Sequence, residues 1–302
     1  MACDIGGTQC RAVVADSGCK VLSRADSSTK KVSGKNIPLL AITALQEALN
    51  KAKKQHKISK ISAIAASIAG YCDSKKGIVV FSPNISNGKN IQMHLIGKKF
   101  KAPFLLYNDG NAAALGVLKL DPKAKGMKNL IYVIMGSGIG SGIVIDGKIY
   151  TGTNGFVGEI GHMVIKEDGR LCSCGKKGCW EAYCSGSSIE KIAFEQTKKR
   201  LTSKQIFDLA KKGNKTAKEL LQEVSKHNIT AIKNIISIFD PEAIFFGESL
   251  LKNENQILAP IRKSLANLPR NQPKILRASV QEPALCGAVW LAVDSCRSKS
   301  VH

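Results

Sequence analysis

The 302-residue sequence lacks any apolar run long enough to cross a bilayer, for which about 20 consecutive apolar residues are needed. Its N-terminus also lacks the charged start and the following apolar stretch of a secretory signal peptide. We therefore expect a cytoplasmic protein with no membrane partner. With 44% hydrophobic residues, the chain can still bury the core of one large domain or of two medium ones.

Acidic residues are scarce: the sequence has 23 of them and 45 basic residues, which gives a formal net charge of +22. Such a balance is typical either of a basic surface for nucleic acid or an anionic membrane, or of a lysine-rich solvated surface around an anionic substrate. The lysines are scattered in short groups, and no helix-turn-helix pattern precedes the first motif at Asp4. The second interpretation is favoured, and we expect no nucleic-acid partner.

The two common nucleotide-binding motifs are absent. Neither Gly6-Gly7-Thr8 nor Gly136-Ser137-Gly138 is followed by the Gly-Lys-Ser/Thr of a Walker A loop. The second loop has no third glycine at G-x-G-x-x-G spacing, and a predicted hairpin follows it where a dinucleotide-binding fold has a helix. Both loops offer backbone N–H groups that an anion can approach closely, and each adds a hydroxyl. They are therefore either phosphate-binding turns or ordinary tight hairpins.

Ten cysteines are present, and three of them are close together at Cys172, Cys174 and Cys179, shortly after His162. Three thiolates and one imidazole complete a tetrahedral zinc shell and leave no open position for catalysis. In a reducing compartment this clustering favours a metal over disulfides. We predict a structural zinc-binding element over residues 162–179, with unrelated free cysteines as the alternative.

Strand and helix patterns alternate along the chain, which predicts an α/β fold. In the N-terminal part we expect strands at 2–5, 11–15, 20–25, 61–68 and 104–107, and helices at 37–54 and 111–118. A second series has strands at 130–135, 142–145, 148–150, 243–246 and near 274–279, with helices at 187–198, 204–212, 214–238 and 284–296. Both series begin with a Gly-rich turn, an apolar strand and an Asp-containing hairpin turn. This repetition predicts an internal duplication that gives two similar lobes, unless the two hairpins resemble each other by chance.

Two aspartates stand at the ends of predicted strands. Asp109 follows one strand and precedes a helix, where a carboxylate can accept the proton of an attacking hydroxyl in phosphoryl transfer. The alternative is that Asp109 only caps that helix. Asp4 precedes the first Gly-rich turn and is a candidate for holding Mg²⁺ through water, or else is a hydrogen-bonded turn residue.

These features together resemble the ROK family (repressor, open reading frame, kinase). The segments that carry the resemblance span almost the whole chain and include "DIGGT" at 4–8, "NDGNAAALG" at 108–116, "MGSGIGSGIVIDGKIYTGTNGFVGEIGHM" at 135–163 and "CSCGKKGCWEAYCSG" at 172–186. The resemblance implies a two-lobed actin-like (ribonuclease H-like) α/β fold with ATP and sugar in an interlobe cleft. The small lobe would be 1–118, completed by the C-terminal helix 284–302. The large lobe would be 119–283, with the zinc-binding element at 162–179.

The family's functional residues transfer to matching positions of this sequence. Asp109 matches the catalytic base, and Gly247 matches the nucleoside side of the ATP site. The sugar-contact positions are Gly70, Asn84, Asn108, Glu159, His162 and Glu181. The phosphate-loop positions are Asp4, Gly6, Gly7, Thr8, Gly136, Ser137 and Gly138, and the zinc-ligand positions are His162, Cys172, Cys174 and Cys179.

The resemblance implies ATP-dependent phosphorylation of a hexose, glucokinase-like, with ATP, Mg²⁺ and a structural Zn²⁺ as cofactors and a homo-oligomer (dimer or tetramer) as the assembly. The alternatives are an N-acetylmannosamine, N-acetylglucosamine or fructose kinase of the same family, or a sugar-binding regulator without activity. The sequence departs from the family at Gln9, where Lys is common, and at Tyr71, where Pro is usual. A third departure is Gly247-Glu248-Ser249, which replaces a Gly-Gly pair.

Overall fold

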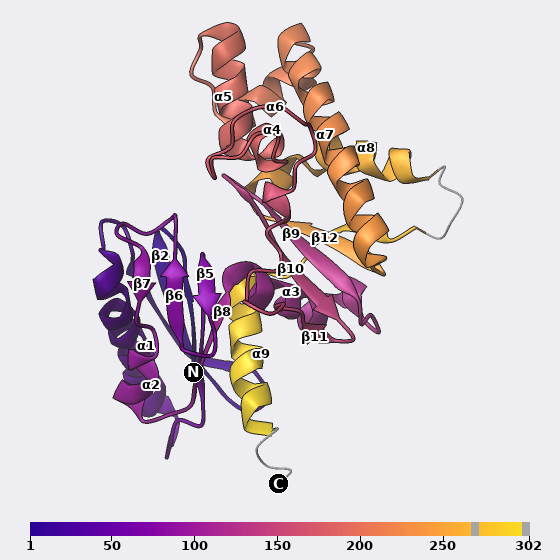
Figure 1. The fold of residues 1–302 in the computed structure, drawn as a ribbon. Coiled ribbons are helices and arrows are strands. Elements are labelled where there is room, and N and C mark those ends of the chain that lie inside the picture. The colour runs from indigo at the N-terminus through magenta and orange to yellow at the C-terminus, as the bar shows by residue number, and fades with distance from the viewer. Residues whose placement is uncertain (267–271, 298–302) are drawn as a thin grey trace. The chain divides into compact units, whose positions relative to one another are not determined.

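The computed structural model describes residues 1–266 and 272–297 of the chain. By their contacts these residues form two compact units (Figure 1). The first unit comprises Met1–Lys125, Lys148–Val157 and the C-terminal segment from Val280. The second unit comprises Gly126–Gly147 and Gly158–Ser279.

A five-stranded sheet forms the centre of the first unit. Its strands, in the spatial order β3-β2-β1-β4-β8, are β3 (Val21–Ser28), β2 (Gln9–Ala15), β1 (Ala2–Ile5), β4 (Ile64–Ile68) and β8 (Phe104–Asn108). The first three strands are antiparallel, and β4 and β8 run parallel to β1. All five predicted strands are confirmed, although β2 begins at Gln9 and β4 begins only at Ile64.

Two helices cover opposite faces of this sheet (Figure 1). The helix α1 (Ile37–Gln55) buries its apolar stripe with Cys3 and Ile5 of β1, whereas α9 (Pro283–Arg297) packs with Ala2. Successive side chains of a strand point to opposite faces, so β1 contributes to both cores. Both helices confirm the predicted periodicity. Residues 298–302 of the predicted C-terminal segment lie outside the described residues.

The first unit also holds a small second sheet that the sequence pattern does not predict. Its strands β5 (Tyr71–Asp73), β6 (Ile78–Phe81) and β7 (Lys89–Ile91) form antiparallel pairs and precede the short helix α2 (Leu95–Phe100). Three- and four-residue strands are too short to show a period in the sequence.

A second five-stranded sheet, with four of its strands in the second unit and β11 in a segment of the first, repeats the strand order of the first sheet. The order is β11-β10-β9-β12-β13, with β9 (Leu130–Met135), β10 (Ile139–Ile145), β11 (Lys148–Ile149), β12 (Ala243–Gly247) and β13 (Lys274–Arg277). The strand β10 is antiparallel to β9, and β12 and β13 continue the sheet in parallel. Because both sheets share this order and these directions, the predicted duplication is confirmed.

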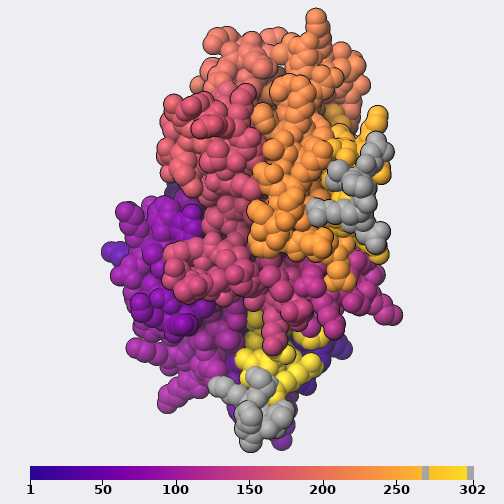
Figure 2. Space-filling model, turned by 45° about the vertical axis from the view of Figure 1, so that its right-hand side comes forward, coloured from indigo at the N-terminus to yellow at the C-terminus, as the bar shows by residue number. Residues whose placement is uncertain are grey.

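The described residues of the second unit form the helices α4 (Glu181–Cys184), α5 (Gly186–Thr197), α6 (Ser203–Lys211), α7 (Lys215–Phe239) and α8 (Glu254–Leu265). The bounds of α5, α6 and α7 agree with the predicted helices to within one residue at each end. The long orange helix α7 lies at the surface in the space-filling view of Figure 2. Short 3₁₀ helices occur at Gly34–Asn36, Pro122–Ala124, Ile160–His162 and Ser249–Asn253. Among the described helices, none has the length and apolarity that a bilayer span requires.

A close approach of α3 (Asp109–Leu120) to α9 closes the first unit, and it depends on two glycines. A Cβ atom at Gly116 would run into the carbonyl oxygen of Pro283, and one at Gly287 would run into the carbonyl oxygen of Ala112. No side chain fits at either position while the two backbones remain this close.

We predict that Gly287→Ala destabilises the protein. Within a helix this change ordinarily stabilises by about 1 kcal/mol, but here the added methyl group overpacks the contact with α3. The free energy of unfolding should fall by about 1 to 3 kcal/mol in a denaturant titration. Gly140→Ala is the control, because its Cβ would meet no heavy atom within 4 Å. A Gly287→Ala protein as stable as the wild type would contradict the prediction.

Candidate functional site

Three strands of the first unit end at the same edge of the sheet. In register, Ile5 lies opposite Ile68 and Ile68 lies opposite Asn108. The segments that follow them are Gly6-Gly7-Thr8, Ala69-Gly70 and Asp109. The structure therefore brings together predicted phosphate-loop, sugar-contact and catalytic positions that are about 100 residues apart in sequence.

Asn108 caps the helix α3. Its Oδ1 accepts hydrogen bonds from the backbone N–H groups of Gly110 (2.8 Å) and Asn111 (3.2 Å), and its Nδ2 donates to the carbonyl of Gly70 (3.1 Å). Asp109 is the first residue of the helix, so the alternative that made Asp109 its cap is wrong. The Asp109 Oδ1 accepts from Gly110 N at 2.9 Å, which orients the carboxylate at the sheet edge.

Two further predicted positions lie beside this edge. A Cβ at Gly7 would be 2.9 Å from the carbonyl oxygen of Asn84, so the first Gly-rich turn packs directly against Asn84. Gly70 has a φ of 142°, and a Cβ there would lie 2.5 Å from the carbonyl oxygen of Phe81. Glycine is required at Gly70 for both reasons.

An aromatic cluster that the sequence did not indicate adjoins Gly70. Tyr71 stacks on Phe81 with ring centroids 6.3 Å apart and meets Phe156 edge-on at 5.4 Å. Phe81 and Phe156 remain substantially exposed. The only sequence signal was Tyr71 itself, which stands where proline is usual in the family.

Asp4 is a strand residue, not a turn residue. Its Oδ1 accepts a hydrogen bond from Ser67 Oγ (2.7 Å), and its Oδ2 pairs with Arg11 (3.2 Å), which is its register partner on β2. Burial raises the pKa of Asp4, while the bonds from Ser67 and Arg11 act against this rise. The carboxylate is thus fixed just before the first Gly-rich turn.

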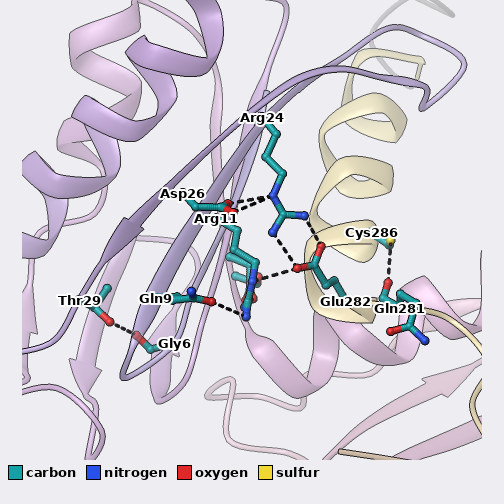
Figure 3. A network of polar contacts seen from close by, with 11 residues as sticks. Gly6, Gln9, Arg11, Arg24, Asp26, Thr29, Gln281, Glu282 and Cys286 are labelled. Atoms are coloured by element: carbon teal, nitrogen blue, oxygen red, sulfur yellow. Dashed lines mark hydrogen bonds and ion pairs between the residues drawn. The ribbon is translucent and has the colours of Figure 1, made fainter.

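Arg11 also belongs to a network of ion pairs, shown in Figure 3. Its Nε lies 3.0 Å from Glu282, and Glu282 accepts two hydrogen bonds from Arg24, at 2.6 and 2.8 Å. Arg24 in turn pairs with Asp26 at 2.9 Å. The hydrogen bonds from Arg24 hold the pKa of Glu282 below its usual range. Sequence reasoning missed this network because Glu282 is more than 250 residues away from its partners.

The lowered pKa of Glu282 makes a pH-dependent contribution to stability. The contribution is fully present above the unfolded-state pKa of about 4.3 and is lost as the pH falls through the lower folded-state value. Glu282→Gln should lower the free energy of unfolding by at most about 1 kcal/mol at pH 7, because the groups are partly exposed. The difference from the wild type should shrink below about pH 4. Equilibrium unfolding at several pH values, with Glu219→Gln on α7 as control, tests this, and a pH-independent difference would contradict it.

In the second unit, Gly136-Ser137-Gly138 forms the turn between β9 and β10. The turn closes through a hydrogen bond from Gly136 N to Gly138 O (3.0 Å), and Gly136 O accepts from Gly186 N at the start of α5 (2.8 Å). The Glu181 Oε2 accepts from Ile139 N at 2.8 Å. A Cβ at Gly138 would lie 2.7 Å from the same Oε2, so a side chain there would displace this carboxylate oxygen.

The predicted zinc ligands converge. The ligand atoms of His162, Cys172, Cys174 and Cys179 all lie within 4.8 Å of one another. The Nδ1 of His162 is 3.6 Å from the Cys172 sulfur, and the sulfurs of Cys174 and Cys179 are 3.7 Å apart. Ligands in a tetrahedral zinc shell are separated by about 3.6 Å (N to S) and about 3.8 Å (S to S). The spacing therefore fits zinc and is far too long for a disulfide.

The remaining predicted residues of the second unit surround this cluster. The outward Nε2 of His162 lies 3.8 Å from a Glu159 oxygen, and Glu181 Oε1 accepts from Ser173 Oγ at 3.3 Å. The fully buried Trp180 donates to Asn228 of α7 at 2.8 Å and anchors the element to the helices. Gly247 is the last residue of β12 and lies opposite Ile134 of β9.

Two α/β units with one strand order, each with a Gly-rich turn, define a duplicated protein of the actin-like fold class. The profile described as "ROK family" matches residues 1–295, and the chain belongs to that family. A glucokinase of Streptomyces coelicolor is 31% identical over 278 residues, which cover 86% of this chain and 85% of that protein.

Solved structures agree with this assignment. A ROK hexokinase from Thermus thermophilus is similar with a TM-score of 0.86 and 26% identity, covering 98% of each chain. A ROK family glucokinase from Streptomyces griseus, determined in complex with glucose and AMPPNP, has a TM-score of 0.76 and 28% identity, covering 97% of this chain and 98% of that chain.

Proposed function

We propose that this protein is an ATP-dependent hexose kinase of the glucokinase type. The observation that carries the proposal is the edge of the first sheet, where the Asp109 carboxylate stands beside Gly70 and the first Gly-rich turn. The relationship to ROK glucokinases, one of them determined with glucose and an ATP analogue, supports the same activity.

Asp109 is the proposed general base. A hexose hydroxyl is a poor nucleophile near neutral pH, and a carboxylate within hydrogen-bond reach both orients it and accepts its proton as the bond to phosphorus forms. The position suits this role because the capping of α3 is done by Asn108. A rigid strand end and a capped helix together hold the carboxylate in place.

Sugar hydroxyls would be bound by residues that already form local networks. In the first unit these are Gly70, Asn84 and Asn108, where one Asn108 amide hydrogen is used by the Gly70 carbonyl and the second is available to a hydroxyl. In the second unit they are Glu159, His162 and Glu181, which surround the cysteine cluster.

Phosphates of ATP would be bound by the backbone N–H groups of Gly6–Thr8 and Gly136–Gly138. Asp4 fits a role in holding Mg²⁺ through water, because each of its oxygens accepts one hydrogen bond and retains a second lone pair. The cation would supply charge neutralisation of the transferred phosphoryl group. Arg11 and Ser67 would keep the Asp4 side chain in one orientation.

Asp109→Asn tests the assignment of the base. The amide keeps the shape and much of the hydrogen bonding but cannot accept a proton at neutral pH, so kcat should fall at least about 100-fold while sugar and ATP still bind. Turnover measured by coupled ADP release and binding measured by calorimetry give the two readouts.

Two variants serve as controls for this test. Asp208→Asn makes the same change at a partly exposed position of α6 and should keep normal kcat. Asn108→Ala removes the true cap and should lower stability by about 1 kcal/mol, whereas Asp109→Asn should leave stability nearly unchanged. Retained turnover in Asp109→Asn would remove this residue from the mechanism.

The acceptor sugar is decided by assaying hexoses against N-acetylhexosamines and fructose, since the family includes kinases for each. We expect the highest kcat/KM with an unsubstituted hexose. Sugar binding without any ADP release across the whole panel would favour the alternative of a sugar-binding regulator.

We further propose that the cluster of His162, Cys172, Cys174 and Cys179 binds one structural Zn²⁺. Four protein ligands close the shell, so the metal would hold the loop together and take no part in the chemistry. The metal would also help to orient the imidazole of His162. Its outward Nε2 faces Glu159, and such a carboxylate partner fixes the orientation of metal-bound imidazoles in many proteins.

The purified protein should contain about one zinc per chain. Cys174→Ser should lose the zinc and lower both the melting temperature and the activity, because metal binding and folding are coupled. Cys286→Ser is the matched control, since Cys286 lies in the first unit, outside the cluster. Metal analysis that finds no zinc before any chelator treatment would refute the zinc site and leave the kinase proposal intact.

A further inference from the structure

Glu248 has a backbone conformation that side chains disfavour. It follows Gly247 at the end of β12 and has a φ of 77° and a ψ of −172°. This region is occupied almost only by glycine, because a Cβ there crowds the neighbouring backbone. A glycine at this position would adopt the same conformation without strain. A residue kept in spite of strain points to a use for its side chain.

The position of Glu248 indicates what that use is. The strands β12 and β9 are parallel, with Gly247 opposite Ile134, so Glu248 lies beside the Gly136–Gly138 turn. A Cβ on Gly136 would be 3.8 Å from the Cβ of Glu248 and 3.8 Å from Ser249 Oγ. The Glu248 side chain is exposed, and within residues 1–266 and 272–297 its carboxylate forms no ion pair.

A carboxylate only accepts hydrogen bonds, and this limits which part of a nucleotide it can bind. Phosphates at neutral pH are themselves acceptors, so the donors of a nucleoside triphosphate are the ribose hydroxyls and the N–H groups of the base. The ribose is attached directly to the α-phosphate. The ribose hydroxyls are therefore the hydrogen-bond donors closest to any turn that binds the phosphates.

We propose that Glu248 accepts hydrogen bonds from the ribose hydroxyls of the nucleotide and thereby selects ribonucleotides over deoxyribonucleotides. The proposal rests on the proposed function, because it requires the triphosphate to bind at Gly136–Gly138. It assigns a selectivity role to the strained residue that follows Gly247.

The opposing effect of Glu248 is repulsion of the phosphates. Repulsion acts on every nucleotide alike and is screened by salt, whereas a ribose contact depends on the hydroxyls. If the carboxylate only repelled phosphate, its removal would tighten ATP and deoxy-ATP equally. The two effects are therefore separated by comparing nucleotides that differ only in the ribose.

The test is calorimetric binding of Mg²⁺ complexes of ATP, 2′-deoxy-ATP and 3′-deoxy-ATP to wild type and Glu248→Ala. The wild type should bind ATP about tenfold more tightly than at least one deoxy analogue, as expected for a hydrogen bond to a charged group. In Glu248→Ala the three dissociation constants should agree to within about twofold. Glu219→Ala, which removes an exposed carboxylate of α7, should keep the wild-type ratio.

The inference would be overturned if the wild type bound the three nucleotides equally, or if Glu248→Ala still discriminated between them. In either case, binding of ATP by the wild type would still support the proposed function. Absence of ATP binding by the wild type would overturn both. Comparing Glu248→Gly with Glu248→Ala tests the strain, because neither variant has the carboxylate and only glycine adopts this backbone conformation freely. Glu248→Gly should melt about 2 to 4 °C above Glu248→Ala. Equal melting temperatures would show that the position is unstrained and remove that support.

Discussion

The candidate site of the first unit depends on the hydrogen bonds that the side-chain amide of Asn108 forms. Its oxygen satisfies two backbone N–H groups at the start of α3, and its nitrogen holds the carbonyl of Gly70 at the end of the neighbouring strand. A helix start leaves orphan donors that some residue has to satisfy. Because Asn108 does so, the next residue, Asp109, can present its carboxylate at the sheet edge. One residue thus links the end of β8, the helix that follows it and the segment after β4.

The alignment of three parallel strand ends makes this arrangement possible. Ile5, Ile68 and Asn108 lie in register, so three distant segments leave the sheet at one edge. The closeness of α3 and α9, set by Gly116 and Gly287, fixes the helix that carries Asp109 against the C-terminal helix. Helix position, strand register and cap therefore constrain the same carboxylate from three directions.

Most of the fold could be predicted from the sequence because its long elements have clear periodicity. The stripe along α1 has helical periodicity, and β9 is recognisable as a short continuous apolar run that ends at a Gly-rich turn. The sheet of β5, β6 and β7 could not be found in this way, since its strands are too short to show a period. The cysteine cluster could be predicted because its three cysteines are close together in sequence, at a spacing typical of metal ligands.

The parts of the site that remained hidden are those made by distant pairing. Glu282 pairs with Arg11 and Arg24 across most of the chain length, and no local pattern reports such a contact. The true cap of α3 was ambiguous because Asn108 and Asp109 both favour that role. Only backbone geometry distinguishes the extended Asn108 from the helical residue after it.

The duplication that gave the two units the same topology did not give them the same chemistry. Asp4 stands one residue before the end of β1, and the corresponding residue of β9 is the apolar Ile134. The Gly-rich turn of the first unit therefore follows a fixed carboxylate, whereas that of the second follows none. In the second unit the carboxylates come from other segments. Glu181 accepts a hydrogen bond from Ile139 directly after the turn, and Glu248 lies beside Gly136. Identical strand order thus provides two Gly-rich turns, and the acidic residues around each turn make the turns different. In a chain with few acidic residues, this placement is the strongest sign that the two turns have separate tasks.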